Sequence, residues 1–250
     1  MVVRTNPLPR QQLKACNMPQ LPLRSMFCLL LLAASSVAVV AEESKSDKPA
    51  DKKAWKPLFN GKDLDGWKVT NFGGEGEVKV EGKGELVIYE GVDLSGITTT
   101  RKDLPTANYE VEFEAQRAKG SDFFVGYTFP VGEDACSFIM GGWGGGICGI
   151  SSLDFMDASE NSTTHYADFA LGKWYTVRVR VTDKLIQAWI DKDEVATVER
   201  EYHDIDVRFE MDVCKPMGFA TYQTVGKIRN ARIRTLSSKE TKAAAAPLNE

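Results

Sequence analysis

The stretch "NYEVEFEAQ", Asn108 to Gln116, alternates apolar and charged side chains with a period of two. Its apolar positions are Tyr109, Val111, Phe113 and Ala115, and the positions between them are Glu110, Glu112 and Glu114. A strand places successive side chains on opposite faces, so this pattern is typical of an antiparallel strand with one buried face and one face in water. The stretch therefore predicts a sheet that packs on one side only.

A second stretch, "WYTVRVRVTD" from Trp174 to Asp183, repeats the alternation with arginine in place of glutamate. Its polar face carries Arg178 and Arg180, opposite in sign to the face of the first stretch. Oppositely charged residues that face each other across two antiparallel strands stabilise one register. If the two strands are neighbours, we expect Glu–Arg pairs to help fix their alignment.

Further strands are predicted on both sides of these two stretches. Apolar or alternating runs occupy residues 77–82, 84–91, 96–102, 122–130, 185–199, 217–224 and 228–236. Turn sequences such as "EGKGE", "DLPTAN" and "DKDE" separate them, and no run of 12 residues has a helical period. The pattern predicts an all-β protein, an antiparallel β-sandwich or jelly roll over residues 55–236, with a closed barrel as the alternative.

The two ends of the chain have a different composition. Residues 1–41 contain basic side chains, the apolar run "MFCLLLLAA" and small residues before Ala41, the pattern of a secretory signal peptide. A single N-terminal membrane anchor is the alternative. Residues 42–54 are charged and predicted to be a flexible linker, and residues 237–250 a disordered tail. The sequence thus favours a secreted or periplasmic protein with no stable membrane span after cleavage.

The charge and the cysteine content limit which ligands and covalent links the chain can have. The first 41 residues hold four basic side chains and no acid, which leaves 27 Lys and Arg against 35 Asp and Glu, a net charge of −8. An acidic surface disfavours nucleic acid as a partner, because phosphate binding needs clustered Lys and Arg. Cys136, Cys148 and Cys214 allow one disulfide of undetermined pairing. No spacing typical of a structural metal occurs, and the sequence leaves the cofactor open.

The alternation stops at "GGWGGGICGI", Gly141 to Ile150, where six glycines surround Trp143. Glycine lets a backbone approach a ligand closely, so the run could present the indole ring to the face of a sugar. The alternative is a glycine-rich strand that crosses a place where bulky neighbours leave no room.

The following loop, "SSLDFMDASENSTTHY", concentrates polar side chains within 16 residues. Asp154, Asp157 and Glu160 are candidate catalytic acids, since two carboxyl groups can divide acid and base roles when their environments differ. His165 is a candidate general base at the end of the loop. Two alternatives remain, a calcium ion ringed by carboxylate oxygens and a solvated loop whose Asp and Ser side chains cap turns.

Several motifs together resemble a known family. "WKPLFNGKDLDGWKV" at residues 55–69 is followed in order by "GELVIYEG", "ITTTRKDLPTANYEVEFEAQ", "GKWYTVRVRV", "AWIDKDEV", "GFATYQ" and "IRNARIRTL". These stretches resemble the 3-keto-disaccharide hydrolase-like family over residues 55–236. The resemblance implies a concanavalin-like jelly roll, and hydrolysis or lyase cleavage of a 3-keto-glycoside.

The middle of the chain departs from the family pattern. Tyr127 in "GSDFFVGY" stands near the position where many members have an arginine, and "CSFIMGGW" lacks the family's acidic groups. Gln223 matches a family glutamine, although "TV" follows it instead of Asp and His. The resemblance therefore implies the fold more strongly than the individual site residues.

The function predicted from the sequence is an exported jelly roll that binds or processes a carbohydrate or glycoside. Trp143 and Tyr127 are predicted as sugar platforms and Gln223 as a hydrogen-bonding group. The predicted catalytic residues are Asp154, Asp157, Glu160 and His165. A non-catalytic glycan-binding or cell-surface adhesion module is the alternative.

Overall fold

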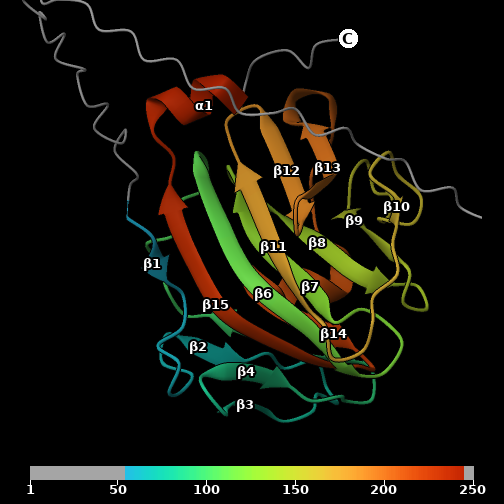
Figure 1. Cartoon of the computed structure of the whole chain (residues 1–250). Coiled ribbons are helices and arrows are strands. Elements are labelled where there is room, and N and C mark those ends of the chain that lie inside the picture. Colours follow the sequence, from blue (N-terminus) through green and yellow to red (C-terminus); the bar gives the residue numbers. More distant parts are fainter. Residues whose placement is uncertain (1–53, 245–250) are drawn as a thin grey trace, which may run out of the picture. The chain divides into compact units, whose positions relative to one another are not determined.

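The computed structural model describes residues 54–244 of the 250-residue chain. Over that range the chain forms two antiparallel sheets that stack face to face (Figure 1). The predicted antiparallel β-sandwich of the jelly-roll type is confirmed. The predicted signal peptide and nearly all of the predicted linker lie outside the described residues.

Sheet A contains eight strands in the order β13-β12-β11-β6-β15-β4-β3, with β1 paired to β15. Their bounds are β1 Lys56–Pro57, β3 Val78–Glu81, β4 Glu85–Ile88, β6 Tyr109–Lys119, β11 Trp174–Val181, β12 Leu185–Ile190, β13 Asp193–Glu199 and β15 Val225–Thr235. The two alternating stretches that led to the fold prediction are β6 and β11, and the structure shows that they are neighbours.

Sheet B contains seven strands in the order β10-β9-β8-β7-β14-β5-β2. Their bounds are β2 Trp67–Val69, β5 Leu94–Thr99, β7 Val125–Val131, β8 Asp134–Gly142, β9 Ile147–Ser151, β10 His165–Tyr166 and β14 Gly218–Tyr222. Strands β8 and β9 were not among the predicted strands, although the end of β8 and most of β9 lie in the glycine run, for which a glycine-rich strand was the alternative interpretation.

The core lies between the two sheets and is built from the predicted alternating positions. Phe113 of β6 meets Tyr127 of β7 and Phe219 of β14 edge-on, at ring-centroid distances of 5.3 and 5.1 Å. The Tyr109 hydroxyl donates a hydrogen bond to the Pro130 carbonyl of the opposite sheet at 2.7 Å. Each ring buried in this way contributes about 1.5–3 kcal/mol. The core therefore fixes sheet B against sheet A.

The outer face of sheet A carries the predicted charge pairs. In the observed register Arg178 faces Glu112 and Arg180 faces Glu110. Strand β15 adds arginines on the other side of β6, where a register shift between Arg229 and Arg232 keeps both side chains on the outer face. The predicted cross-strand Glu–Arg neighbours are thus present, and Arg180 pairs with Glu110 at 2.7 Å.

Short helices complete the described fold. They are η1 Arg200–Tyr202, η2 Phe209–Cys214 and α1 Ser238–Ala244. Helix α1 lies in the segment that the sequence indicated as a disordered tail. It begins with a capping box, in which Glu240 accepts from the Ser237 backbone N–H at 2.9 Å, and Arg234 pairs with Glu240 at 2.7 Å. These local bonds order residues that have no buried apolar side chain.

Candidate functional site

The outer face of sheet B differs from that of sheet A because small residues form it and a segment of chain lies over it. This crossing segment, residues 200–217, contains η1 and η2. Met211 and Cys214 pack with Ala135, Val207 and Ala220 in a small cluster outside the main core. A Cβ atom on Gly126 would lie 3.3 Å from Met211 Cε. The small side chains of sheet B therefore make room for the crossing segment.

A cleft of about 680 Å³ lies beside η2 on this face. We call it the ring-lined cleft, because five aromatic side chains border it: Phe72, Phe123, Trp143, Phe209 and Tyr222. Its polar lining consists of Asn71, Asp93, Asp122, Ser137, Ser151, Arg208 and Glu210. Aromatic faces combined with a few convergent polar groups are the usual lining of a small-molecule site.

The glycine run positions Trp143 at the cleft. Trp143 has a left-handed backbone (φ 51°) and its side chain is 40% exposed. A Cβ atom on Gly141 would lie 2.9 Å from the Phe124 ring, and one on Gly145 would lie 2.6 Å from Arg117 Nη1. The structure therefore contains features of both interpretations of the glycine run. Its glycines fill crowded positions, and the indole between them borders the cleft.

Asp122 fixes the turn that carries Trp143. One carboxylate oxygen accepts from the Phe123 N–H at 2.7 Å, and the other accepts from the Gly144 N–H at 2.9 Å. Both oxygens are thus used by the backbone. Asp122 therefore positions the indole at the cleft.

On the opposite side of the cleft, Arg208 holds two carboxylates. It pairs with Asp157 at 2.6 Å and binds Glu210 through both Nε and Nη2, at 3.1 and 3.0 Å. Partial burial raises the pKa of Glu210, but the hydrogen bonds from Arg208 and its charge outweigh burial and leave that pKa below its ordinary value. Glu210 is therefore an ionised group at neutral pH.

Asp93 and Tyr222 lie at the edge of the cleft where β5 meets β14. The charge of Asp93 is the first cause that raises the pKa of the Tyr222 phenol above its ordinary value. The Gln223 side-chain amide donates to Asp93 Oδ1 at 3.2 Å and to the Val92 carbonyl at 3.1 Å. The predicted hydrogen-bonding residue Gln223 is thus a neighbour of the cleft that contacts it through Asp93.

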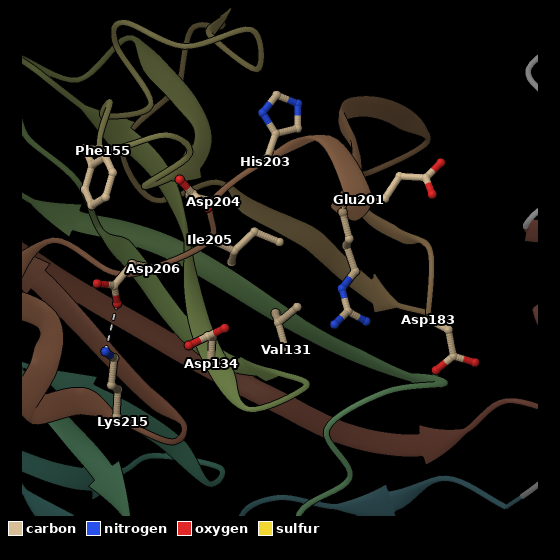
Figure 2. Close-up of a pocket in the computed structure, with 11 residues that line it drawn as sticks. Val131, Asp134, Phe155, Asp183, Glu201, His203, Asp204, Ile205, Asp206 and Lys215 are labelled. Carbon is tan, nitrogen blue, oxygen red and sulfur yellow. Dashed lines mark hydrogen bonds and ion pairs between the residues drawn. The ribbon is translucent and has the colours of Figure 1, made fainter.

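A second hollow, of about 700 Å³, is lined mainly by residues 200–206 of the crossing segment, whereas the ring-lined cleft is lined by residues 208–213 of the same segment (Figure 2 shows the second hollow). We call this second hollow the polar cavity. Its lining consists of Val131, Asp134, Phe155, Asp183, Arg200, Glu201, His203, Asp204, Ile205, Asp206 and Lys215. Lys215 pairs with Asp206 at 2.8 Å, as Figure 2 shows, and this pairing lowers the pKa of Asp206.

Asp154 reaches the rim of the polar cavity from the acidic loop. Its Oδ2 lies 2.7 Å from His203 Nδ1, and its Oδ1 accepts from the Asp204 N–H at 2.9 Å. The hydrogen bond with His203 lowers the pKa of Asp154, so the carboxylate is ionised and Nδ1 must donate the proton. His165 was the histidine predicted to act with this loop, whereas in the structure Asp154 bonds to His203.

The remaining acidic-loop residues are scattered. Asp157 contacts the ring-lined cleft through Arg208 and Ser151, while Glu160 is exposed and lines neither hollow. His165 lies on β10, where its carbonyl accepts from the Cys148 thiol, and it also lines neither hollow. The predicted catalytic residues thus do not converge in one cleft.

The prediction that Tyr127 offers its ring to a sugar is wrong. The side chain is fully buried between the sheets and stacks on Phe219 and Phe129 at centroid distances of 4.8 and 5.4 Å. Position 127 belongs to the inward-facing set of β7, and the alternation of that strand would have placed it in the core. Of the predicted site residues only Trp143 lines the ring-lined cleft.

Three other features were open at the level of sequence. Cys136, Cys148 and Cys214 are buried free thiols, and burial raises the pKa of each to about 12. Within residues 54–244, no three His, Cys, Asp or Glu side chains gather as they would around a metal ion. None of the helices described there is long and apolar enough to span a membrane.

Two stacked antiparallel sheets define a jelly roll, and the ring-lined cleft on one outer face is its candidate ligand site. The sequence pattern of the 3-keto-alpha-glucoside-1,2-lyase-like domain matches residues 54–234. The chain therefore belongs to that family, and the predicted resemblance is confirmed.

The solved structures that resemble this chain share only a low sequence identity with it. The Crh5 transglycosylase in its apo form shares 15% identity with a TM-score of 0.49, over 74% of this chain and 85% of that chain. A candidate glycosyl hydrolase from Parabacteroides distasonis shares 16% identity with a TM-score of 0.46, over 73% of this chain and 94% of that chain. A glycosyl hydrolase family protein from Mycobacterium fortuitum shares 12% identity with a TM-score of 0.45, over 71% of this chain and 95% of that chain. Similarity at this level concerns the strand arrangement alone. None of the curated proteins compared with the chain matches it.

Proposed function

We propose that the chain binds a glycoside in the ring-lined cleft and cleaves it as a 3-keto-glycoside lyase. The observation that supports binding is the half-exposed indole of Trp143 at a cleft bordered by four further aromatic rings. A pyranose ring packs its C–H face on such rings while its hydroxyl groups bond to nearby carboxylates and amides. Family membership supports the keto-sugar as the substrate class.

The chemistry of a 3-keto-glycoside favours elimination. The ketone at carbon 3 makes the hydrogen on carbon 2 acidic, because the resulting carbanion is an enolate. A base removes that proton, the bond between carbon 1 and the glycosidic oxygen breaks, and a double bond forms between carbons 1 and 2. The departing oxygen takes up a proton. An ionised carboxylate is a suitable base, and the charge of Arg208 in the cleft can stabilise the enolate oxygen.

Direct hydrolysis fits this cleft less well. A glycosidase of the two-carboxylate type needs one carboxylic acid that stays protonated, which requires a raised pKa. The hydrogen bonds from Arg208 lower the pKa of Glu210 instead. We also propose, from the signal-like residues 1–41, that the domain is exported and meets its glycoside outside the cytoplasm.

The test of the binding site is Trp143→Ala. Loss of this ring contact should weaken the binding of a 3-keto-α-glucoside by about 1–3 kcal/mol, or roughly 5- to 150-fold, in isothermal titration calorimetry. Tyr166→Ala is the matched control, because Tyr166 is exposed and lines neither hollow. Equal affinity of the two variants would remove the cleft from the binding site.

The test of the reaction is the product. Elimination yields an unsaturated ketone that absorbs in the ultraviolet, whereas hydrolysis yields a saturated 3-keto sugar that does not absorb there. Binding without either product would make the domain a glycan-binding module.

A further inference from the structure

Two residues that the sequence did not single out lie together at the edge of the ring-lined cleft. Tyr222 ends β14 and pairs in register with Leu94, the first residue of β5, so Asp93 immediately precedes its cross-strand partner. The Gln223 backbone N–H donates to the Asp93 carbonyl at 3.0 Å, which extends the pairing of the two strands beyond their ends. Asp93 and Tyr222 both line the cleft.

Of the carboxylates that line the cleft, only the Asp93 carboxylate accepts neither a backbone N–H nor a guanidinium group among the described hydrogen bonds. Asp122 accepts backbone N–H donors on both oxygens, and Glu210 accepts the Arg208 guanidinium on both. The Asp93 carboxylate accepts a hydrogen bond from the Gln223 side-chain amide at 3.2 Å, and the Tyr222 phenol is its other hydrogen-bond partner among the described residues. A carboxylate that accepts no backbone or guanidinium donor can take up a proton from a substrate without giving up a structural bond.

Tyr222 presents a phenol in the same place. Its ring stacks on Phe123 with a centroid distance of 6.0 Å, and its backbone N–H donates to the Phe123 carbonyl at 3.0 Å, which fixes the direction of the side chain. The charge of Asp93 raises the pKa of the phenol, so Tyr222 carries its proton at neutral pH. A protonated, fixed phenol is a suitable proton donor.

We propose that Asp93 is the catalytic base and Tyr222 the catalytic acid of the elimination, an inference that depends on the proposed function. Asp93 takes the proton from carbon 2 of the 3-keto-glycoside. The electron pair forms the double bond between carbons 1 and 2 as the bond to the glycosidic oxygen breaks. Tyr222 gives its proton to that oxygen, and the later return of a proton from Asp93 to Tyr222 restores both groups.

The other acid–base pair among the described residues lies elsewhere. His203 lines the polar cavity and Asp154 is its hydrogen-bond partner, and neither lines the ring-lined cleft. A substrate held against Trp143 therefore meets the Asp93–Tyr222 pair. The two pairs make different predictions, and mutations distinguish them.

The experiment compares two 3-keto-α-glucosides that differ in their leaving group. A 4-nitrophenolate leaves without protonation, whereas the alkoxide of a sugar needs a proton as it leaves. Asp93→Asn should lower kcat about 100- to 10,000-fold on both substrates, because both lose a proton from carbon 2. Tyr222→Phe should lower kcat by a similar factor on the disaccharide and only a few-fold on the nitrophenyl glycoside.

Matched controls are Asp134→Asn in the polar cavity and Tyr166→Phe on β10, neither of which lines the ring-lined cleft. Both should keep wild-type turnover. Solvent deuterium exchange at carbon 2 gives a second readout, since Asp93→Asn should abolish exchange while Tyr222→Phe should retain it. Circular dichroism and calorimetric affinity show that each variant is folded and binds substrate.

Each outcome is decisive. Wild-type turnover in Asp93→Asn, or equal loss on both substrates in Tyr222→Phe, would overturn the assignment. Loss of turnover in His203→Gln with Asp93→Asn unaffected would assign the chemistry to the polar cavity. If the wild-type protein binds no 3-keto-glycoside, the proposed function itself fails, whatever the variants do.

Discussion

The outer faces of the two sheets differ in the size and charge of their side chains. On sheet A, arginine and glutamate alternate across three neighbouring strands, and guanidinium groups stack on indoles, Arg178 on Trp189 at 4.0 Å and Arg229 on Trp174 at 3.9 Å. On sheet B, small residues such as Gly126, Gly218 and Ala220 form the face. The first face is completed by its own side chains, and the second is covered by another segment of chain.

The difference shows where a ligand site can form. On sheet A the Glu side chains of β6 pair with Arg side chains of the neighbouring β11 and β15, so these groups are already used by the protein itself. On sheet B the missing side-chain volume admits the crossing segment, and the ring-lined cleft lies where that segment does not fill the face. A close-packed protein has space for a ligand only where its own side chains leave it.

The largest expected effect is on sheet A. The Glu110 side chain is 3% exposed and accepts from Arg180 and Arg234, at 2.7 and 3.0 Å. Glu110→Gln keeps the shape but leaves these guanidinium groups without a buried counter-charge. We expect the free energy of unfolding in urea to fall by about 3 kcal/mol, the low end for breaking a buried pair because both arginines reach solvent. Glu112→Gln, whose side chain is 27% exposed, should cost less than about 1 kcal/mol. Equal losses would show that burial of the pair does not matter.

A smaller effect is expected in the turn that carries Trp143 beside sheet B. Gly145→Ala would place a Cβ 2.7 Å from the Ser121 carbonyl and 2.6 Å from Arg117, at φ +105°. Gly144→Ala meets nothing within 4 Å at φ +85°, so it should carry the backbone strain alone. We expect the free energy of unfolding to fall by about 2–3 kcal/mol for Gly145→Ala and by about 1 kcal/mol for Gly144→Ala. Glycoside binding should weaken for Gly145→Ala only. Two variants of equal stability would mean that crowding does not shape this turn.

The smallest expected effect on stability is at α1, where Glu240 pairs with Arg234 of sheet A. The backbone hydrogen bond from Ser237 is the first cause that lowers the pKa of Glu240 from 4.5 to about 2, and the pairing with Arg234 adds to it. A carboxyl group with a lowered pKa in the folded state adds stability that is complete above pH 4.5 and lost as the pH falls towards 2. Glu240→Gln should therefore lower Tm by about 2 °C at pH 7, and the difference from wild type should shrink between pH 4 and pH 2. A difference independent of pH would contradict this cause.

Most of the fold was predictable because it depends on patterns that are local in sequence. The alternation in "NYEVEFEAQ" and "WYTVRVRVTD" predicted the strands β6 and β11. The opposite signs of their polar faces indicated Glu–Arg pairs if the two strands were neighbours, and only the structure showed that they are. Strands β8 and β9 were missed, because glycines at positions 141, 142 and 149 interrupt their alternation. A Cβ atom on Gly141 would lie 2.9 Å from the Phe124 ring and one on Gly149 would lie 2.7 Å from the Thr163 carbonyl, and these neighbours are known only from the tertiary structure.

The site was less predictable than the fold. Trp143 could be found because a tryptophan among six glycines is unusual at any position in a sequence. Asp93 and Tyr222 carried no such signal, since they are 129 positions apart and neither lies in a cluster of polar residues. The acidic loop was the more conspicuous candidate in the sequence, yet Asp154 bonds to His203 at the polar cavity while Asp157 bonds to Arg208 at the ring-lined cleft.

The amino-acid sequence alone determined that the chain forms two amphipathic sheets, because a strand's periodicity of two assigns each side chain to the core or to solvent before any long-range contact is known. It also determined the family. Only the tertiary structure decided which polar residues share a cleft, because the register between β5 and β14 and the path of the crossing segment bring together residues from distant parts of the chain. Periodicity gives the direction of a side chain, but its neighbours depend on how the sheets and loops pack.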